Sequence, residues 1–215
     1  MPTTPEKLLL GSVSLGGVVG GGFLIKNYSS TPEDKSLSSK LRSKKYELLS
    51  FNNDHDSHWG NIADAYKTQT ESNSKLKINN TTITGKETAD LTSLKNACKA
   101  ILEADFSQAN YDLAIKWCVV PETVSSRMDK DGRKVLKLDS TDSQESTIWE
   151  DLMKKHNSET TANKKFSDLT ETLETGETGI AKLRGKCSSV KDKKTYEADY
   201  ESSYQKIHDF CSVAK

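Results

Sequence analysis

Residues 91–102, LTSLKNACKAIL, carry the clearest structural signal in the chain. Their apolar positions recur with the period of an α-helix and form one face, whose members are Leu91, Leu94, Ala97, Cys98, Ile101 and Leu102. Lys95, Lys99 and Glu103 lie outside this face, where water can solvate them. The stretch therefore predicts an amphipathic helix whose Cys98 faces a core.

Similar apolar stripes occur on both sides of this helix. They predict further helices with core positions at Trp59, Ile62, Ala63 and Tyr66 after a cap at Asp56 or Ser57; at Tyr111, Ala114, Ile115 and Cys118 between about Gln108 and Pro121; at Ile148, Trp149, Leu152, Met153 and His156; at Phe166, Leu169 and Leu173; and at Tyr196, Tyr200, Ile207, Phe210 and Cys211. An earlier helix is expected from Pro32 or Glu33, with Leu37, Leu41 and Leu48 along one side. The expected fold is mainly α: a small helical bundle.

The segments between these stripes lack helical periodicity. We read residues 73–85, rich in Asn, Thr and Lys, as a loop with a short strand at Thr81–Thr84. Asp131 and Gly132 predict a turn, and residues 135–138 a strand or a loop. Gly185 and Cys187 are expected in a short connection.

Composition limits both the core and the choice of partner. Of 215 residues only 33% are hydrophobic, so the core should be thin. The 31 basic and 31 acidic residues cancel, which leaves no overall field to attract a nucleic acid. We therefore expect no nucleic-acid partner and a surface solvated by its charges.

An uncharged apolar segment, LLLGSVSLGGVVGGGFLI, occupies Leu8–Ile25 between Lys7 and Lys26. As a helix its eighteen residues would be about 27 Å long. The hydrocarbon core of a bilayer is roughly 30 Å thick, so the segment is just long enough to span it with slight thinning. We predict a signal-anchor in residues 1–26, a juxtamembrane linker in 27–35 and a polar helical domain in 36–215, with the lipid bilayer as a partner.

Two readings compete with this anchor, and its orientation is disputed. A cleaved signal peptide is disfavoured because no small-residue cleavage site stands near Ile25, and a buried glycine-rich turn is a further reading. The cluster of lysines and arginines after the segment would keep the domain inside under the positive-inside rule. The short N-terminus and the even number of cysteines instead favour a single-pass cell-membrane protein with its C-terminal domain outside.

All four cysteines, Cys98, Cys118, Cys187 and Cys211, lie beyond the apolar segment. Four cysteines permit three pairings. We favour Cys98–Cys118 with Cys187–Cys211, because each pair would join neighbouring helices. The competing reading is four free thiols that act as small buried apolar residues, since no CxxC metal or redox spacing occurs.

Motifs for chemistry are weak. His55 and His58 with Asp54 and Asp56 could begin a metal site, but their spacing matches no standard motif and helix capping explains the aspartates. A calcium loop through Asp129 to Gly132 would place Arg127 and Leu138 at two positions that need oxygen ligands. We expect no catalytic, cofactor-binding or metal-binding residues, no cofactor and no enzymatic activity.

Three features together define a resemblance. The chain has the glycine-rich apolar start quoted above, Trp117-Cys118 before Val119 and Val120, and a late Phe210-Cys211-Ser212. In this layout it resembles the large paralogous families of uncharacterised proteins in haemotrophic mycoplasmas. The resemblance implies a bacterial membrane-associated or surface protein without known activity that contributes to antigenic variation.

The expected function is therefore a membrane-anchored surface module for antigen display or for interaction with a host protein. The alternatives are an exported binding protein for a host ligand and an enzyme whose site no local motif reveals. A pocket lined by Trp59, Trp117 and Trp149 would favour binding, and their burial in one closed core would favour a display scaffold.

Overall fold

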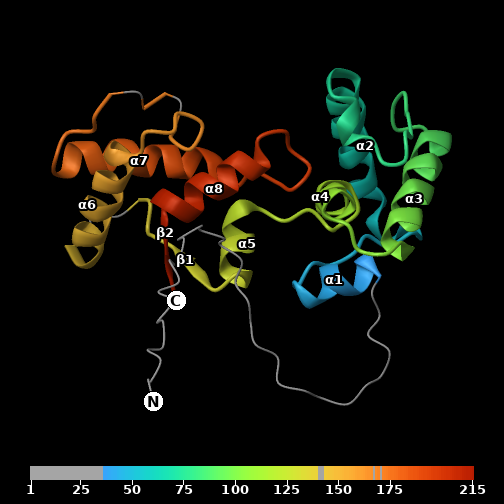
Figure 1. Ribbon diagram of the computed structural model, residues 1–215, viewed down its shortest axis with the longest axis horizontal. Helices are drawn as coiled ribbons and strands as arrows, with labels where there is room; N and C mark the ends of the chain where they lie inside the picture. The colour runs from blue at the N-terminus through green and yellow to red at the C-terminus, as the bar shows by residue number, and fades with distance from the viewer. Residues whose placement is uncertain (1–35, 140–142, 167, 170) are drawn as a thin grey trace, which may run out of the picture. The chain divides into compact units, whose positions relative to one another are not determined.

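The computed structural model describes residues 36–139, 143–166, 168–169 and 171–215. In this part of the chain it contains eight α-helices and one two-stranded sheet, which confirms the predicted mainly α-helical fold (Figure 1). The predicted membrane segment Leu8–Ile25 and the linker 27–35 lie outside the described residues. Within them, no helix combines the length and apolar character needed to cross a bilayer.

The first four helices surround one hydrophobic cluster. The helices are α1 (Leu37–Ser43), α2 (Asp56–Ser72), α3 (Thr88–Glu103) and α4 (Gln108–Trp117), with 3₁₀ turns at η1 (Asn53–His55) and η2 (Ser74–Leu76). The predicted faces of α2 and α3 are buried in this cluster, except that Leu91 at the start of the α3 face is only partly buried. Two aromatic side chains at its centre also satisfy their polar atoms: Trp117 Nε1 donates to Leu76 O at 3.0 Å, and Tyr66 Oη donates to Thr81 O at 2.9 Å. The η2 loop is thereby attached to the core.

A second hydrophobic cluster is formed by the later elements. They are α5 (Val124–Lys130), β1 (Arg133–Val135), α6 (Ser143–Ser158), α7 (Glu177–Val190), α8 (Tyr200–Phe210) and β2 (Ser212–Ala214). Helices α6, α7 and α8 contact one another in pairs (Figure 1). The two strands pair antiparallel, with Lys134 opposite Val213. This pairing places the C-terminal strand β2 beside β1, which follows α5.

The two clusters belong to one compact unit. Side-chain hydrogen bonds from the first half reach the segment before α8: Gln69 Nε2 of α2 donates to Tyr196 O at 2.8 Å, and Lys116 Nζ of α4 donates to Glu197 O at 2.9 Å. The Arg127 guanidinium lies 4.3 Å from the centre of the Tyr46 ring, which packs against the first cluster. Polar contacts therefore connect the two halves.

Several predicted elements were wrong in their extent. Helix α1 ends at Ser43 because Lys45 adopts a left-handed conformation (φ 63°) and the chain turns there. Leu48 lies beyond the helix and forms an isolated bridge with Val119. Helix α4 ends at Trp117, ahead of Pro121.

Other predictions were wrong in kind. Thr81–Thr84 is not a strand, although Ile83 is buried there. The described residues between 166 and 173 form turns and loop, so the spacing of Phe166 and Leu173 reflects two separate burial points and not one helical face. Gly185 and Cys187 lie inside α7, and helix α5, which Thr123 caps, was not predicted.

The predicted cap of α2 was also wrong. His55 occupies the cap position without a side-chain cap bond, and Asp56 is the first helical residue. Its carboxylate instead pairs with Lys95 at 3.0 Å. Electrostatic stabilisation of the first turn explains an aspartate there as well as capping does.

Gly179 is the tightest position of the α6–α7 contact. A β-carbon at this residue would lie 1.9 Å from Glu174 O and 2.7 Å from Met153 Sδ. A β-carbon at Gly185, on the same helix, would meet nothing within 4 Å. The packing therefore leaves no room for a side chain at Gly179, whereas a side chain fits at Gly185.

We predict that Gly179→Ala lowers the free energy of unfolding by about 1–3 kcal/mol or more, because the methyl group forces backbone and Met153 apart. Gly185→Ala is the matched control and should raise it by up to about 1 kcal/mol through helix propensity. Chemical denaturation of both variants checks this. Equal effects of the two substitutions would contradict the packing argument.

His156 is fully buried in the second cluster, and both its ring nitrogens lack a hydrogen-bond partner among the described residues. Its ring lies 5.0 Å from that of Phe210 and 6.0 Å from that of Phe166. Burial, helped by the charge of Lys165, lowers the pKa of His156 from 6.5 to about 4. The folded protein therefore holds this imidazole neutral.

Between pH 6.5 and pH 4 the unfolded chain binds the proton that the folded chain excludes, so stability falls as the pH falls through this window. The loss attributable to His156 is on the order of 3 kcal/mol. We predict that His156→Leu removes this part of the pH dependence, while Met153→Leu in the same cluster retains it. Denaturation midpoints at pH 7 and pH 4.5 test this, and an unchanged pH slope in His156→Leu would refute it.

Candidate functional site

Two disulfides account for all four cysteines. Cys98 is bonded to Cys118 and Cys187 to Cys211, with Cα atoms 5.5 Å and 6.0 Å apart. These are the two pairs that the sequence analysis favoured over the other connectivities and over free thiols. All four residues have no solvent exposure.

Each disulfide ties the end of one helix to the interior of another. Cys118 is the residue that follows α4, and its partner Cys98 lies within α3. Cys211 likewise follows α8, and its partner Cys187 lies within α7. One bond lies in each hydrophobic cluster, so each small core carries its own covalent link.

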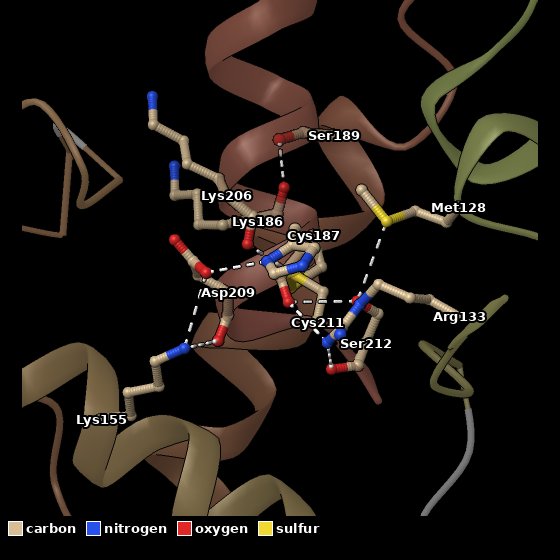
Figure 2. Close-up of a disulfide and its surroundings, with 11 residues drawn as sticks. Met128, Arg133, Lys155, Lys186, Cys187, Ser189, Lys206, Asp209, Cys211 and Ser212 are labelled. Carbon is tan, nitrogen blue, oxygen red and sulfur yellow. Dashed lines mark hydrogen bonds and ion pairs between the residues drawn. A yellow bond between two sulfur atoms is a disulfide. The ribbon is translucent and has the colours of Figure 1, made fainter. Parts of the chain in front are cut away.

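Figure 2 shows the second disulfide between α7 and α8, with the residues that surround it. Ser212 follows Cys211 and is buried, and its hydroxyl lies 3.9 Å from Met128 Sδ on α5. On the other side, Lys155 Nζ of α6 donates to Asp209 O at 3.0 Å. The disulfide is therefore surrounded by the four helices α5, α6, α7 and α8 and by the C-terminal strand.

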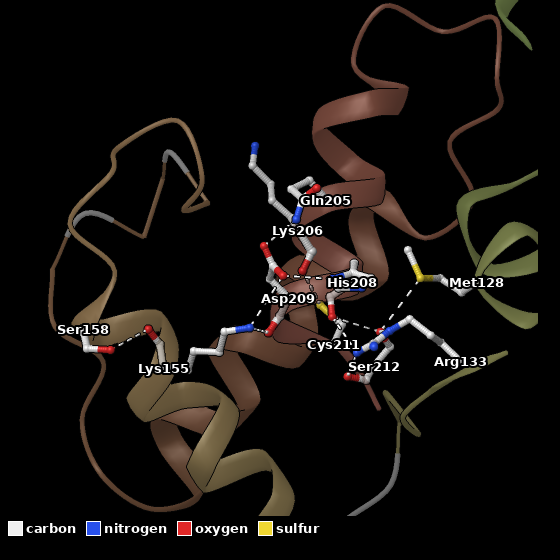
Figure 3. A network of polar contacts seen from close by, with 10 residues as sticks. All are labelled: Met128, Arg133, Lys155, Ser158, Gln205, Lys206, His208, Asp209, Cys211 and Ser212. Atoms are coloured by element: carbon white, nitrogen blue, oxygen red, sulfur yellow. Dashed lines mark hydrogen bonds and ion pairs between the residues drawn. The ribbon is translucent and has the colours of Figure 1, made fainter. Parts of the chain in front are cut away.

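The polar network of Figure 3 holds that C-terminal strand in place. Arg133 donates from Nη2 to His208 O at 3.0 Å and to Ser212 O at 2.8 Å, and from Nε to Ser212 Oγ at 2.9 Å. His208 Nδ1 and Asp209 Oδ1 lie 2.9 Å apart. The Arg133 guanidinium therefore ties β1 to the end of α8 and to the first residue of β2.

The histidine and aspartate cluster considered from the sequence does not form a metal site. His55 Nδ1 accepts a hydrogen bond from Ser50 N at 2.9 Å, and its ring contacts that of His58 at 5.6 Å. No group of three potential metal ligands occurs in the part of the chain that the structure describes. Asp131, from the rejected calcium loop, instead binds the Arg127 guanidinium.

The three tryptophans fit neither arrangement foreseen for them. All are fully buried, but Trp59 and Trp117 belong to the first cluster and Trp149 to the second. None of them lines either of the two pockets described here. The three side chains therefore contribute to packing in two separate clusters.

The candidate binding site is a groove of about 770 Å³ on the compact unit. Residues from α2, the η2 turn and α4 line it together with the segment 195–201, and they are Gln69, Ser72, Asn73, Lys75, Leu76, Ala109, Asp112, Leu113, Ile115, Lys116, Thr195, Ala198, Tyr200 and Glu201. This volume lies within the range of ligand-binding pockets in proteins. We call this feature the α4–α8 groove.

Charges of both signs border the α4–α8 groove. Burial lowers the pKa of Lys116, whose ammonium donates to Glu197 O at 2.9 Å and lies 5.0 Å from the Trp117 ring. Burial and the neighbouring charge of Asp112 raise the pKa of Glu201. The lysine is therefore engaged by the protein, and Asp112 and Glu201 are close enough for their charges to interact.

A second, smaller pocket of about 460 Å³ lies between η1 and α3. Phe51, one of two large apolar residues exposed in the described chain, lines it beside Asp56 and Lys95. The latter two form an ion pair with each other at 3.0 Å. Because these two charges already pair with each other, we give this pocket less weight than the α4–α8 groove.

A buried charged cluster beside the groove was missed by the sequence analysis. Arg127 binds Asp131, which also accepts a hydrogen bond from Tyr204 Oη at 2.8 Å. Lys130 Nζ lies 3.1 Å from Glu122 Oε1. Burial raises the pKa of Tyr200, whose hydroxyl has no partner among the described residues. The i, i+4 spacing of Arg127 and Asp131 is the one signal that could have indicated it.

No family model matches the chain, and neither a curated protein nor a solved structure matches it. The site is therefore interpreted from its own geometry.

We predict that replacing Cys98 and Cys118 together by alanine lowers the free energy of unfolding by about 3 kcal/mol, as expected for a closed loop of this size. The equivalent change at Cys187 and Cys211 should have a similar effect. Hydrogen exchange should show lost protection mainly in the cluster that carried the missing bond. If each double variant instead lost protection equally in both clusters, the two disulfides would not stabilise separate clusters.

Proposed function

We propose that the chain is a membrane-anchored surface protein whose helical domain is displayed outside the cell as an antigen or host-interaction module. Leu8–Ile25 would supply the anchor. The observation that carries the proposal is the pair of buried disulfides, one in each hydrophobic cluster, that together engage every cysteine of the chain.

Structural disulfides form and persist in oxidising surroundings and are rare where cellular reductants act. A domain with few apolar residues gains more from such links, because burial alone contributes little stability. With two small clusters and 33% hydrophobic residues, this chain fits that description. An extracellular position of the domain therefore accounts for its cysteine use better than a cytoplasmic one.

The surface and the core support a display role over catalysis. Equal numbers of acidic and basic residues solvate the domain, and its tryptophans serve packing. No group of three potential metal ligands occurs among the described residues. The resemblance to the paralogous families of haemotrophic mycoplasmas supports the same proposal and adds a contribution to antigenic variation.

The second candidate is an exported binding protein for a host ligand. The α4–α8 groove favours it, since the groove has the volume of a ligand site and two exposed carboxylates at its border. Both proposals place the domain outside the cell. They differ in whether its surface binds a specific host ligand.

Protease treatment of intact cells tests the location. The full chain would be expressed with an epitope tag after Lys215, beside a cytoplasmic marker protein. We expect protease to remove the tag from intact cells while the marker stays whole. Tag protection in intact cells, with digestion only after lysis, would place the domain inside and remove the proposal.

A further inference from the structure

His156, near the end of α6, is the one histidine that is fully buried in the described chain, and neither of its ring nitrogens has a hydrogen-bond partner there. Its ring stacks on that of Phe166 and meets that of Phe210 edge-on. A charge on this imidazole would have neither water nor an acceptor beside it, which costs free energy. Protonation of the ring therefore requires that part of its surroundings move and admit water.

The charges around these rings also oppose a proton on His156. Besides burial, the charge of Lys165 disfavours the imidazolium. Two further lysines lie over the neighbouring rings, Lys155 at 5.6 Å from the centre of Phe210 and Lys206 at 5.9 Å from that of Phe166. Carboxylates of the surrounding elements pair elsewhere: Asp209 with Lys155 and His208, Asp168 with Lys186, and Glu177 with Arg184. The imidazole has no hydrogen bond to any of these carboxylates.

The wall that Phe166 and Leu173 provide comes from the stretch between α6 and α7, which is attached by side chains. Asn157, the neighbour of His156, holds Leu173 with two bonds: Nδ2 donates to Leu173 O, and Leu173 N donates to Oδ1, both at 2.9 Å. Near Phe166 the backbone hydrogen bonds of the described residues are local, such as Leu169 N to Phe166 O at 2.9 Å. Few contacts must break to lift these two side chains from the cluster.

The other walls around His156 are harder to move. Helix α8, which carries Phe210, is linked through Cys211 to Cys187 of α7, and it also contacts α5 and α6. The strand that follows α8 pairs with β1. Local opening of a protein follows the route that breaks the fewest contacts. Water therefore reaches the imidazole at the lowest free energy when Phe166 and Leu173 leave and the helices stay.

We propose that His156 makes the second cluster an acid-sensitive switch, in which protonation releases Phe166 and Leu173 while α6, α7 and α8 stay packed. The released state exposes an aromatic surface, formed by His156 and Phe210, that the neutral protein covers. Global stability falls through the same pH window, but the local opening comes first because it breaks fewer contacts. The switch belongs to the folded domain and operates wherever the domain resides.

Hydrogen exchange of the full-length chain, in a neutral detergent, at pH 7 and pH 4.5 tests the switch, with labelling times scaled to the intrinsic exchange rates. Leu173 N is the main reporter, because Asn157 protects it in the closed state. We expect the opening equilibrium in peptides that contain Phe166 or Leu173 to rise roughly ten- to a hundredfold at pH 4.5. Peptides of α3 and α8 should keep their protection at both pH values.

Variants then assign the opening to the imidazole. His156→Leu removes the titrating group and should keep Phe166 and Leu173 protected at pH 4.5. Lys165→Gln removes the cation that opposes the proton, so it should reduce the opening at pH 4.5 roughly two- to fivefold. Lys164→Gln, at the exposed neighbouring residue, is the matched control and should leave the opening unchanged.

Unchanged protection of Phe166 and Leu173 peptides at pH 4.5 in the unaltered chain would overturn the proposal. A loss of protection that persists in His156→Leu would overturn it too, as would an equal loss in α3 and α8, because the chain would then unfold as a whole. If His156→Leu does not fold, equal opening of Lys165→Gln and Lys164→Gln decides against the switch.

Discussion

The covalent bonds Cys98–Cys118 and Cys187–Cys211 are the constraint on which both hydrophobic clusters depend. Each cluster is built by a few short helices, and each contains the end of one helix tied to the middle of another. Without the bonds, the ordering of so many polar residues would have to be offset by a small apolar core alone. The bonds reduce the entropy of the unfolded chain and so offset part of that cost.

The contact between the two clusters is of a different kind. It is made by side-chain hydrogen bonds from α2 and α4 to the segment before α8, and by the charged group around Arg127, whose guanidinium lies against the Tyr46 ring. Burial raises the pKa of Tyr46 in this group, although the charge of Arg127 opposes the effect. The α4–α8 groove takes lining residues from both halves beside this polar contact.

Local periodicity predicted the faces of α2 and α3 and the helical class, because these helices bury one continuous stripe each. It failed between Phe166 and Leu173, where two apolar residues reach the core from a loop, and at Gly185, where a glycine sits on the exposed side of a helix. Helix α5 was missed because only seven residues form it and two of its buried side chains are apolar. The groove could not be predicted, since it depends on tertiary contacts between α4 and the segment 195–201.

The central claim is that both disulfides are formed in the cell and stabilise the folded domain there. The most direct measurement is acid quenching of cells that express the chain, followed by alkylation with a mass-adding thiol reagent before and after reduction. The account predicts no labelled cysteine before reduction and four after it. Four labelled cysteines before reduction would contradict it, because the cores would then form with free thiols in a reducing compartment.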